Sequence, residues 1–285
     1  MRSEPFISGL TESEVRPFGM DVLKYKDKYY QISGQRIPYR WDKTEDDWFF
    51  ILTLFGIASE IETNGAYIPG IKRLQLAVGL PPAHYGAQNE KFIRYFSRRG
   101  VVSFTYRGRP YSICIDDVAC YPQFYAAASM LQTFTAVPLA LVVDIGSYTM
   151  DYIRIKKRRS DLVSCGSLEN GVIMLYNKII SKVRAAQDIL LTEEEIDAIL
   201  LGQSVQELQA VIPVVERCAQ EFVSDLLSAL REHQSELRTA TVVFVGGGSI
   251  LIKRHIEESG KVAHSMSVED IRANARGYEM LYRVA

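Results

Sequence analysis

Residues 139–155 constrain the fold of this chain more than any other stretch, because hydrophobic pattern, turn chemistry and polar spacing agree there. Their sequence is LALVVDIGSYTMDYIRI. The uncharged run Leu139–Val143 predicts a buried β-strand that ends at Asp144, and Gly146 allows a tight turn directly afterwards. An extended, roughly alternating pattern resumes over 148–153. The stretch therefore predicts a β-hairpin.

The turn of this hairpin has groups that suit a phosphate ligand. The turn residues are Gly146, Ser147, Tyr148 and Thr149, and an acidic residue lies on each side of the turn, Asp144 before it and Asp151 after it. Backbone N–H groups of Gly146 and Ser147, with the hydroxyls of Ser147 and Thr149, would surround a terminal phosphate. A carboxylate at the strand end would hold Mg²⁺ or its waters. An ordinary hairpin with an acidic turn is the alternative, because Asp and Gly are common turn residues.

A second glycine-rich loop follows another strongly apolar segment. The segment Thr241–Val245 predicts a strand, and before an expected helix over 250–258 come Gly246, Gly247, Gly248 and Ser249. Glycines at a strand-to-helix junction let a ligand approach the backbone, and the helix N-terminus has partial positive charge. A dinucleotide-binding turn of the form G-x-G-x-x-G is the alternative, but Leu251 stands where that motif needs its third glycine.

The hairpin motif DxGxxTxD, followed later by strand, GGGS and helix, resembles the second half of the actin-like ATPase fold, which sugar kinases share. Within that fold the sequence is most similar to the ParM-like plasmid-segregation actins of bacteria and phages. The resemblance extends to VGLPPAHYGAQNEKFIRYF at 78–96, VSFTYRGRPYSICIDDVACYPQFYAAA at 102–128 and ANARGYEMLY at 273–282. It implies an α/β protein with two RNase H-like domains around a nucleotide cleft.

The resemblance also implies a domain organisation. We expect an N-terminal domain over 1–138 and a C-terminal domain over 139–285, with the final helix packing back on the fold. An actin-like ATPase would open with a strand and a phosphate loop of the form DxGxxxxK, and the start MRSEPFISGLTESEVRPF has neither. The first strand and first phosphate loop are therefore expected to be missing. Truncation or a late start codon explains this, and a degenerate actin that no longer hydrolyses nucleotide is the alternative.

Roles for particular residues follow from the same resemblance. Asp144 is implied as the catalytic and metal-binding residue that positions Mg²⁺ and water. Residues 146–149 grip the phosphate, Asp151 steadies the hairpin, and residues 246–249 face the nucleoside. Gly171, at the start of the next expected helix, borders the nucleotide.

Gln123 is the second implied catalytic residue. It stands at the start of an expected small-residue helix over 124–131, where the family has a Gln or Glu that orients the attacking water. Glutamine can hold a water but is a poor base, so the implied hydrolysis is slow. A simple helix cap at Gln123 is the alternative.

The function implied is a filament-forming NTPase. It would bind ATP or GTP with Mg²⁺, polymerise with copies of itself, and hydrolyse nucleotide slowly to drive segregation of plasmid or phage DNA through a DNA-binding adaptor. A non-hydrolysing actin-like module that regulates other filaments is one alternative. A sugar or acid kinase of the same fold is another; it would need a catalytic aspartate such as Asp116 or Asp117, which have no glycine-rich partner.

Composition sets further bounds. With 33 basic and 34 acidic residues and 47% hydrophobic residues, the chain is nearly neutral and predicted to be globular. The basic run 156–159 lies between expected strands, so we interpret it as an exposed turn rather than a direct DNA-binding site. The four cysteines have no metal-ligand spacing, no signal peptide precedes them, and no apolar run approaches the ~18 residues of a membrane span, so a cytoplasmic protein is expected.

Local signals predict several element boundaries. Hairpins are expected over 20–39 and 101–115. Capping boxes are expected where Thr44 precedes Asp47 and where Thr192 precedes Glu195. The last helix is expected to start at Ser267.

Overall fold

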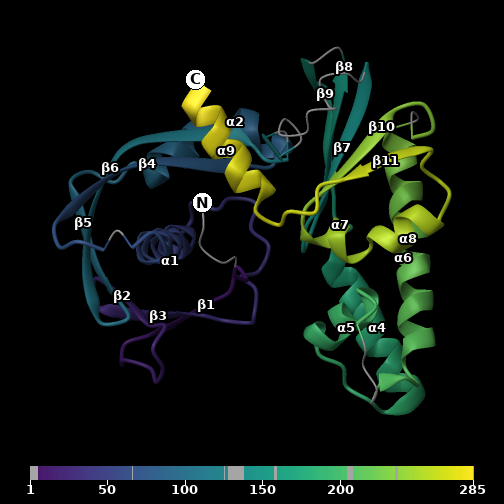
Figure 1. Cartoon of the computed structure of the whole chain (residues 1–285), viewed down its shortest axis with the longest axis horizontal. Helices are drawn as coiled ribbons and strands as arrows, with labels where there is room; N and C mark the ends of the chain where they lie inside the picture. Colours follow the sequence, from purple (N-terminus) through teal and green to yellow (C-terminus); the bar gives the residue numbers. More distant parts are fainter. Residues whose placement is uncertain are drawn as a thin grey trace. The chain divides into compact units, whose positions relative to one another are not determined.

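The computed structural model has an α/β fold built from two compact units. The described residues are 6–65, 67–124, 126–127, 138–156, 159–203, 208–234 and 237–284, without the side chains of 159–163. Unit 1 comprises Met1–Leu80, His84–Tyr121 and Tyr278–Ala285, and unit 2 comprises Pro81–Ala83 and Pro122–Gly277. Each unit contains a β-sheet of its own (Figure 1).

Unit 1 is built on a six-stranded sheet of order β1-β3-β2-β5-β6-β4. The strands are β1 (Leu10–Ser13), β2 (Leu23–Tyr25), β3 (Lys28–Ile32), β4 (Ile71–Leu80), β5 (Val101–Tyr106) and β6 (Arg109–Pro122). The sheet curves around α1 (Trp48–Thr63), while α2 (Pro82–Phe96) follows β4 (Figure 1). Phe50 and Leu54 of α1 are fully buried in a core that also includes Phe104 and Ile113 of the sheet.

The two hairpins predicted in unit 1 are confirmed, but the cap predicted for α1 is wrong. β2 pairs with β3 across a turn at Lys26, and β5 pairs with β6 across a turn at Arg107. Thr44 does not cap α1, because its N–H and hydroxyl both donate to Asp42 in a local turn. The helix begins at Trp48, with Asp47 at the capping position but making no side-chain cap hydrogen bond.

Unit 2 is built on a five-stranded sheet of order β11-β10-β7-β8-β9. The strands are β7 (Leu139–Ile145), β8 (Met150–Lys156), β9 (Arg159–Leu168), β10 (Thr241–Val245) and β11 (His264–Ser267). β11, β10 and β7 are parallel to one another, whereas β8 pairs antiparallel with both β7 and β9. The predicted hairpin is therefore present as β7 and β8.

Both faces of the unit 2 sheet are covered, which explains the unbroken apolar run in β7. Leu141 and Val143 belong to the core beneath the helices, whereas Val142 belongs to a separate cluster with Phe124 and Val243. Successive strand residues face opposite sides of a sheet, so a strand buried on both sides needs apolar residues at every position.

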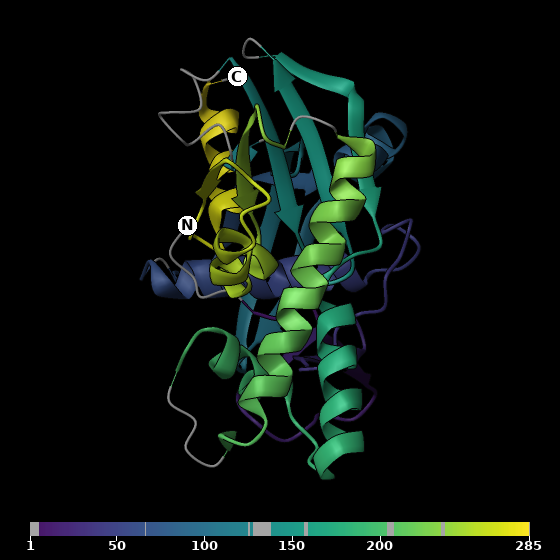
Figure 2. The same ribbon diagram turned by 90° about the vertical axis from the view of Figure 1, so that its right-hand side faces the viewer.

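The helices of unit 2 follow the sequence between its strands. They are α4 (Val172–Gln187), α5 (Glu193–Leu200), α6 (Ile212–His233), α7 (Gly247–Leu251) and α8 (Lys253–Glu258). The long α6 lies alongside α4 (Figure 2). The capping box predicted at the start of α5 is confirmed, since the Glu195 N–H donates to the Thr192 hydroxyl and the Thr192 N–H donates to the Glu195 carboxylate.

The start predicted for the last helix is wrong. Ser267 ends β11, which pairs with β10 in parallel, and α9 (Ala273–Val284) begins six positions later in the chain. Asp270 organises this start: its carboxylate accepts the Arg272 N–H and its carbonyl accepts the Ala273 N–H. α9 then passes from unit 2 into unit 1 between Gly277 and Tyr278. No helix within the described ranges is long and apolar enough to cross a membrane.

Candidate functional site

The predicted site residues of unit 2 gather where its parallel strands end. β7 and β10 run in the same direction, with Val245 opposite Asp144, so Asp144 and Gly246 emerge at the same edge. Ligands of open α/β sheets bind at the carboxyl ends of such strands, where successive loops leave the sheet. The two motifs found far apart in the sequence therefore meet at one place.

Asp144 is held from two sides. A Cβ atom built on Gly246 would lie 2.1 Å from Asp144 Oδ1, so only glycine leaves room for this carboxylate. The Nδ2 of Asn274 donates to Asp144 Oδ2 at 3.3 Å. The Asp144 side chain is nevertheless partly exposed, because it lies at the end of its strand.

Asp144 also faces a second carboxylate. Asp151 is its direct partner in the register of β7 and β8, so both side chains lie on the same face of the hairpin. Like charges at such positions destabilise a hairpin unless something compensates them. Mg²⁺ takes one or two carboxylates together with water and phosphate oxygens, so the partly exposed Asp144 is the member of this pair that is chemically suited to such an ion.

The hairpin turn uses some of the donors that were expected to bind phosphate. The Gly146 N–H, which was expected to contact phosphate, donates to the Thr149 carbonyl at 2.9 Å and closes the turn. The Thr149 hydroxyl donates to Asp151 Oδ2 at 2.9 Å, and Asp151 is buried. Asp151 thus stabilises the turn from inside.

Ser147 retains donors that can reach a ligand. It lies at the tip of the turn and is partly exposed, as are its neighbours Gly146 and Tyr148. Within the described parts of the chain, neither the N–H nor the hydroxyl of Ser147 makes a hydrogen bond. An exposed amide and hydroxyl beside a strand-end carboxylate form a small anion-binding group.

The N-terminus of α4 is occupied by the hairpin itself. The N–H groups of Gly171, Val172 and Ile173 donate to the carbonyls of Tyr148, Gly146 and Ser147 at 3.1, 3.1 and 3.0 Å. A Cβ atom on Gly171 would lie 2.3 Å from the Ser147 carbonyl oxygen, so this glycine is required for the close approach. Gly171 therefore packs directly against the backbone of the hairpin turn and helps to hold it in place.

The second glycine loop has an exposed and a buried half. Gly246 is partly exposed and Gly247 is exposed, whereas Gly248 and Ser249 are buried. The Ser249 hydroxyl donates to the Gly246 carbonyl at 2.7 Å, and a Cβ atom on Gly248 would lie 2.6 Å from Val172. Only the first half of this loop presents backbone to the strand edge.

Asn274 is the functional candidate that motif analysis missed. It lies in the first turn of α9, and its Oδ1 accepts the Phe124 N–H at 2.5 Å while its Nδ2 donates to Asp144. Gln123 immediately precedes Phe124, so Asn274 joins the segment of one predicted catalytic residue to the other. The stretch 273–282 had supported the family resemblance, but nothing in its local pattern assigns a partner to Asn274. The helix expected over 124–131 lies mostly outside the described residues.

The other acidic candidates pair within unit 1. Asp116 forms an ion pair with Arg73 at 2.7 Å, and Asp117 accepts the Tyr282 hydroxyl at 2.7 Å. Among the described residues, no group of three or more His, Cys, Asp or Glu side chains is placed to hold a metal ion. Within these described residues, side chains of these four types would therefore supply at most two ligands to a metal ion.

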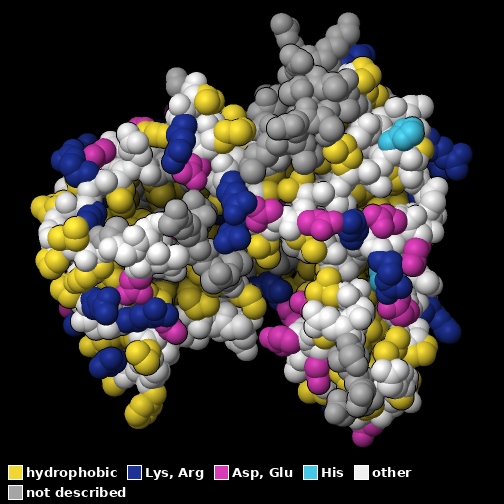
Figure 3. Space-filling view, in the orientation of Figure 1, with side chains coloured by type: hydrophobic (Ala, Val, Ile, Leu, Met, Phe, Trp, Pro, Cys, Tyr) yellow, Lys and Arg dark blue, Asp and Glu magenta, His cyan; other side chains and the backbone are white. Residues whose placement is uncertain are grey.

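Charge on the molecule is mixed. On the face seen in Figure 3, basic and acidic side chains are interspersed rather than gathered by sign. Lys253 pairs with Glu269 at 2.5 Å and Arg254 with Glu216 at 2.6 Å. Within the basic run 156–159, Lys156 is exposed at the end of β8, and residues 157–158 lie outside the described residues.

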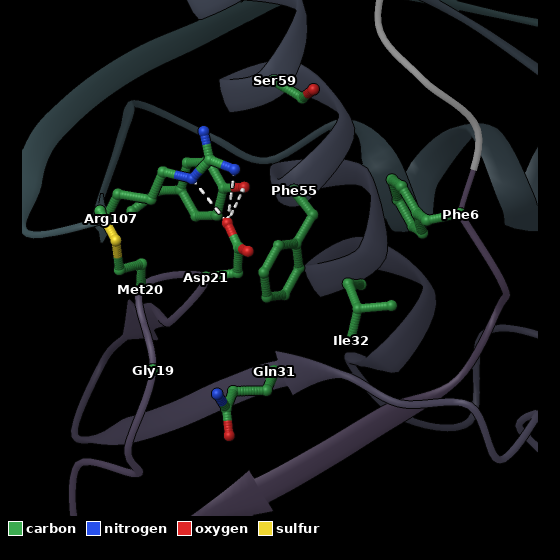
Figure 4. A pocket seen from close by; sticks show the side chains of 10 residues that line it. Phe6, Gly19, Met20, Asp21, Gln31, Ile32, Phe55, Ser59 and Arg107 are labelled. Atoms are coloured by element: carbon green, nitrogen blue, oxygen red, sulfur yellow. Dashed lines mark hydrogen bonds and ion pairs between the residues drawn. The ribbon is translucent and has the colours of Figure 1, made fainter.

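Unit 1 contains a pocket of about 470 Å³ that no sequence motif indicated. One wall is aromatic, with Phe6 packed edge-on against Phe55, and another is polar (Figure 4). Asp21 Oδ1 accepts from Arg107 Nε at 2.6 Å and from the Tyr106 hydroxyl at 3.2 Å. These polar groups of the pocket satisfy one another, and none of the predicted site residues lines it.

Comparisons with known proteins address the fold. The model of the archaeal actin homologue MreB-like C-terminal family matches residues 142–258, which contain both glycine loops. The crystal structure of the archaeal actin homologue Ta0583 superposes with a TM-score of 0.75 at 18% identity, covering 98% of this chain and 92% of that chain. This chain has the actin-like fold.

Two ParM structures also superpose on nearly the whole of this chain. The apo pSK41 ParM protein superposes on the actin-like chain with a TM-score of 0.66 at 15% identity, covering 98% of this chain and 90% of that one. ParM of Bacillus thuringiensis with AMPPNP superposes with a TM-score of 0.71 at 11% identity, covering 96% of this chain and 90% of that one. Among curated proteins, none matches the sequence. The predicted α/β class and the resemblance to ParM-type actins are confirmed for this actin-like chain.

Proposed function

We propose that this chain is a filament-forming actin-like protein that binds a nucleoside triphosphate with Mg²⁺ at the edge of the unit 2 sheet. The observation that carries the proposal is the meeting of a partly exposed carboxylate, Asp144, with the Ser147 donors and the Gly246 backbone. Each group alone is common, but together they supply a metal ligand, an anion contact and a close backbone approach.

Each residue has a defined part in this proposal. The N–H and hydroxyl of Ser147 donate to phosphate oxygens, with Gly146, Tyr148 and Thr149 forming the turn that holds Ser147. Asp144 would hold Mg²⁺ or its waters, and a bound Mg²⁺ would neutralise charge on the phosphate oxygens. The backbone at Gly246 and Gly247 faces the nucleoside.

Hydrolysis in this proposal depends on Gln123. A neutral carboxamide both donates to and accepts from a water, so it can orient the attacking molecule but removes its proton poorly. The reaction is therefore slow, and ATP and GTP are both candidate substrates.

Similar structures support nucleotide binding and self-assembly. The Ta0583 actin homologue has been solved in complex with ADP, and ParM of Bacillus thuringiensis with AMPPNP and with ATP. The Alp12 protein, which superposes with a TM-score of 0.59 at 16% identity, has been solved as a filament. We infer by analogy that this chain assembles with copies of itself, and that a DNA-binding adaptor links the filament to plasmid or phage DNA.

Sedimentation tests the filament. With Mg²⁺ and ATP or GTP, the chain is expected to pellet above a critical concentration, and to remain in the supernatant without nucleotide or with EDTA. The pelleted fraction is measured by gel densitometry over a range of chain concentrations. If no polymer forms at any concentration with either nucleotide, self-assembly is excluded even where nucleotide binding is retained.

A further inference from the structure

The carboxamide of Asn274 is fixed by two different partners. Its Nδ2 donates to Asp144 Oδ2 at 3.3 Å and its Oδ1 accepts the Phe124 N–H at 2.5 Å. One partner is an acceptor and the other a donor, so only one orientation of the amide satisfies both. A change at either partner therefore changes what Asn274 can offer to the other.

Phe124 occupies a strained position. Its φ is +46°, in the left-handed region that bulky L-residues rarely adopt, and its side chain is fully buried. Such a conformation persists only where surrounding contacts impose it. The contacts here are the burial of the ring beside Val142 and Ala273 and the hydrogen bond to Asn274. Gln123 precedes this strained residue, so the same contacts determine where Gln123 lies.

The first turns of α9 also touch the chain that follows Phe124. A Cβ atom on Gly277 would lie 2.4 Å from the backbone of Ala126, so the two backbones are in direct contact. Asn274 and Gly277 lie on neighbouring turns of α9. The same end of the helix therefore contacts Asp144, Phe124 and Ala126.

We propose that Asn274 is a positioning residue that transmits the ligand state of Asp144 to the segment carrying Gln123. A ligand bound at Asp144 would compete with Asn274 for the carboxylate, and a change in the Asn274–Asp144 hydrogen bond would change the acceptor that Asn274 offers to the Phe124 N–H. This role rests on the proposed nucleotide site, but the link between Asp144 and Phe124 exists in the protein without nucleotide.

The nucleotide-free link is tested by amide hydrogen exchange at Phe124. Asn274→Ala removes the acceptor and is expected to speed exchange about two- to tenfold, the effect of losing one hydrogen bond. Asp144→Ala is also expected to speed it, although Asp144 does not contact the Phe124 amide. The matched control is Asn64→Ala, at the exposed end of α1 in unit 1, which is expected to leave exchange unchanged. Unchanged Phe124 exchange in Asp144→Ala overturns the proposal.

A second experiment compares nucleotide binding with nucleotide hydrolysis. In Asn274→Ala, kcat for nucleotide hydrolysis is expected to fall about tenfold while Kd for the Mg²⁺–nucleotide changes less than about threefold. Nucleotide is expected to alter Phe124 exchange in the natural chain but not in Asn274→Ala. A raised Kd with unchanged kcat overturns the positioning role.

The two hypotheses fail in different ways. If the natural chain neither binds nor hydrolyses nucleotide, the proposed function fails, while the nucleotide-free exchange comparison still decides whether Asp144 and Phe124 are coupled. Should Asp144→Ala not fold, Asp144→Ser retains a small polar side chain, lacks the carboxylate, and serves in the same comparison. An increase in Phe124 exchange supports the link, and an unchanged rate contradicts it.

Discussion

Replacing Asp144 with alanine is expected to weaken binding of the Mg²⁺–nucleotide on the order of a hundredfold, because one interaction with a charged group contributes ~1.5–3 kcal/mol. The unfolding free energy is expected to change by less than about 1 kcal/mol, since the hydrogen bond lost from Asn274 is offset by relief of repulsion with Asp151. Calorimetric titration measures the first quantity and urea denaturation the second.

The matched control for this prediction is Asp116→Ala. Asp116 is an exposed aspartate that pairs with Arg73 on unit 1. Its removal is expected to leave nucleotide affinity unchanged, because exposed ion pairs contribute little to stability and this one lies outside the proposed site. Equal loss of affinity in both variants would mean that Asp144 acts only through general charge.

Gly246→Ala is expected to destabilise the chain by about 2–4 kcal/mol and to disrupt the position of Asp144. The φ of Gly246 is +88°, where L-residues are strained, and the new Cβ atom would lie 2.1 Å from Asp144 Oδ1. Since the glycine loop and the carboxylate cannot both keep their places, the folded state loses this packing. Urea denaturation measures the loss.

Gly260→Ala separates the two causes of that loss. Gly260 also has a positive φ, +62°, but a Cβ atom there would meet nothing within 4 Å. Gly260→Ala is therefore expected to lower the free energy of unfolding only through backbone strain, by about 1 kcal/mol. If Gly246→Ala is no more destabilising than Gly260→Ala, the contact between Gly246 and Asp144 does not matter energetically.

Strands β7 and β10 of unit 2 were predictable because their signals are local and strong. The run 139–143 is apolar at successive positions because both faces of β7 are buried, and Asp144 and Gly146 follow it closely. The glycine loop after β10 was predictable for the same reason, because the apolar strand and the glycines are adjacent in the sequence.

Boundaries that depend on distant partners were not predictable. Ser267 has the composition of a helix cap, yet 264–267 is a strand because it pairs with β10. Nothing in HSMS favours a strand by itself, so the tertiary contact overrides local preference. Thr44 likewise resembles a cap, but Asp42 two positions earlier captures its donors.

The residues of the proposed site can be selected from the sequence, but the contacts among them cannot. The sequence indicates Asp144, Ser147 and Gly246 through turn and glycine motifs. It does not show that the Gly146 N–H closes the turn, that Gly171 supports it from behind, or that Asn274 bonds Asp144 from 130 positions along the chain. These are contacts between segments that a linear pattern does not encode.

The most direct test of the nucleotide site is calorimetric titration of the unmodified chain with ATP, GTP and adenosine, each in the presence of Mg²⁺. Because the proposed contacts are to phosphate and to its metal, at least one triphosphate is expected to bind on the order of a hundredfold more tightly than adenosine, and EDTA is expected to reduce that difference. Absence of binding by both triphosphates, or equal binding of adenosine, would contradict a phosphate site formed by Asp144, Ser147 and Gly246.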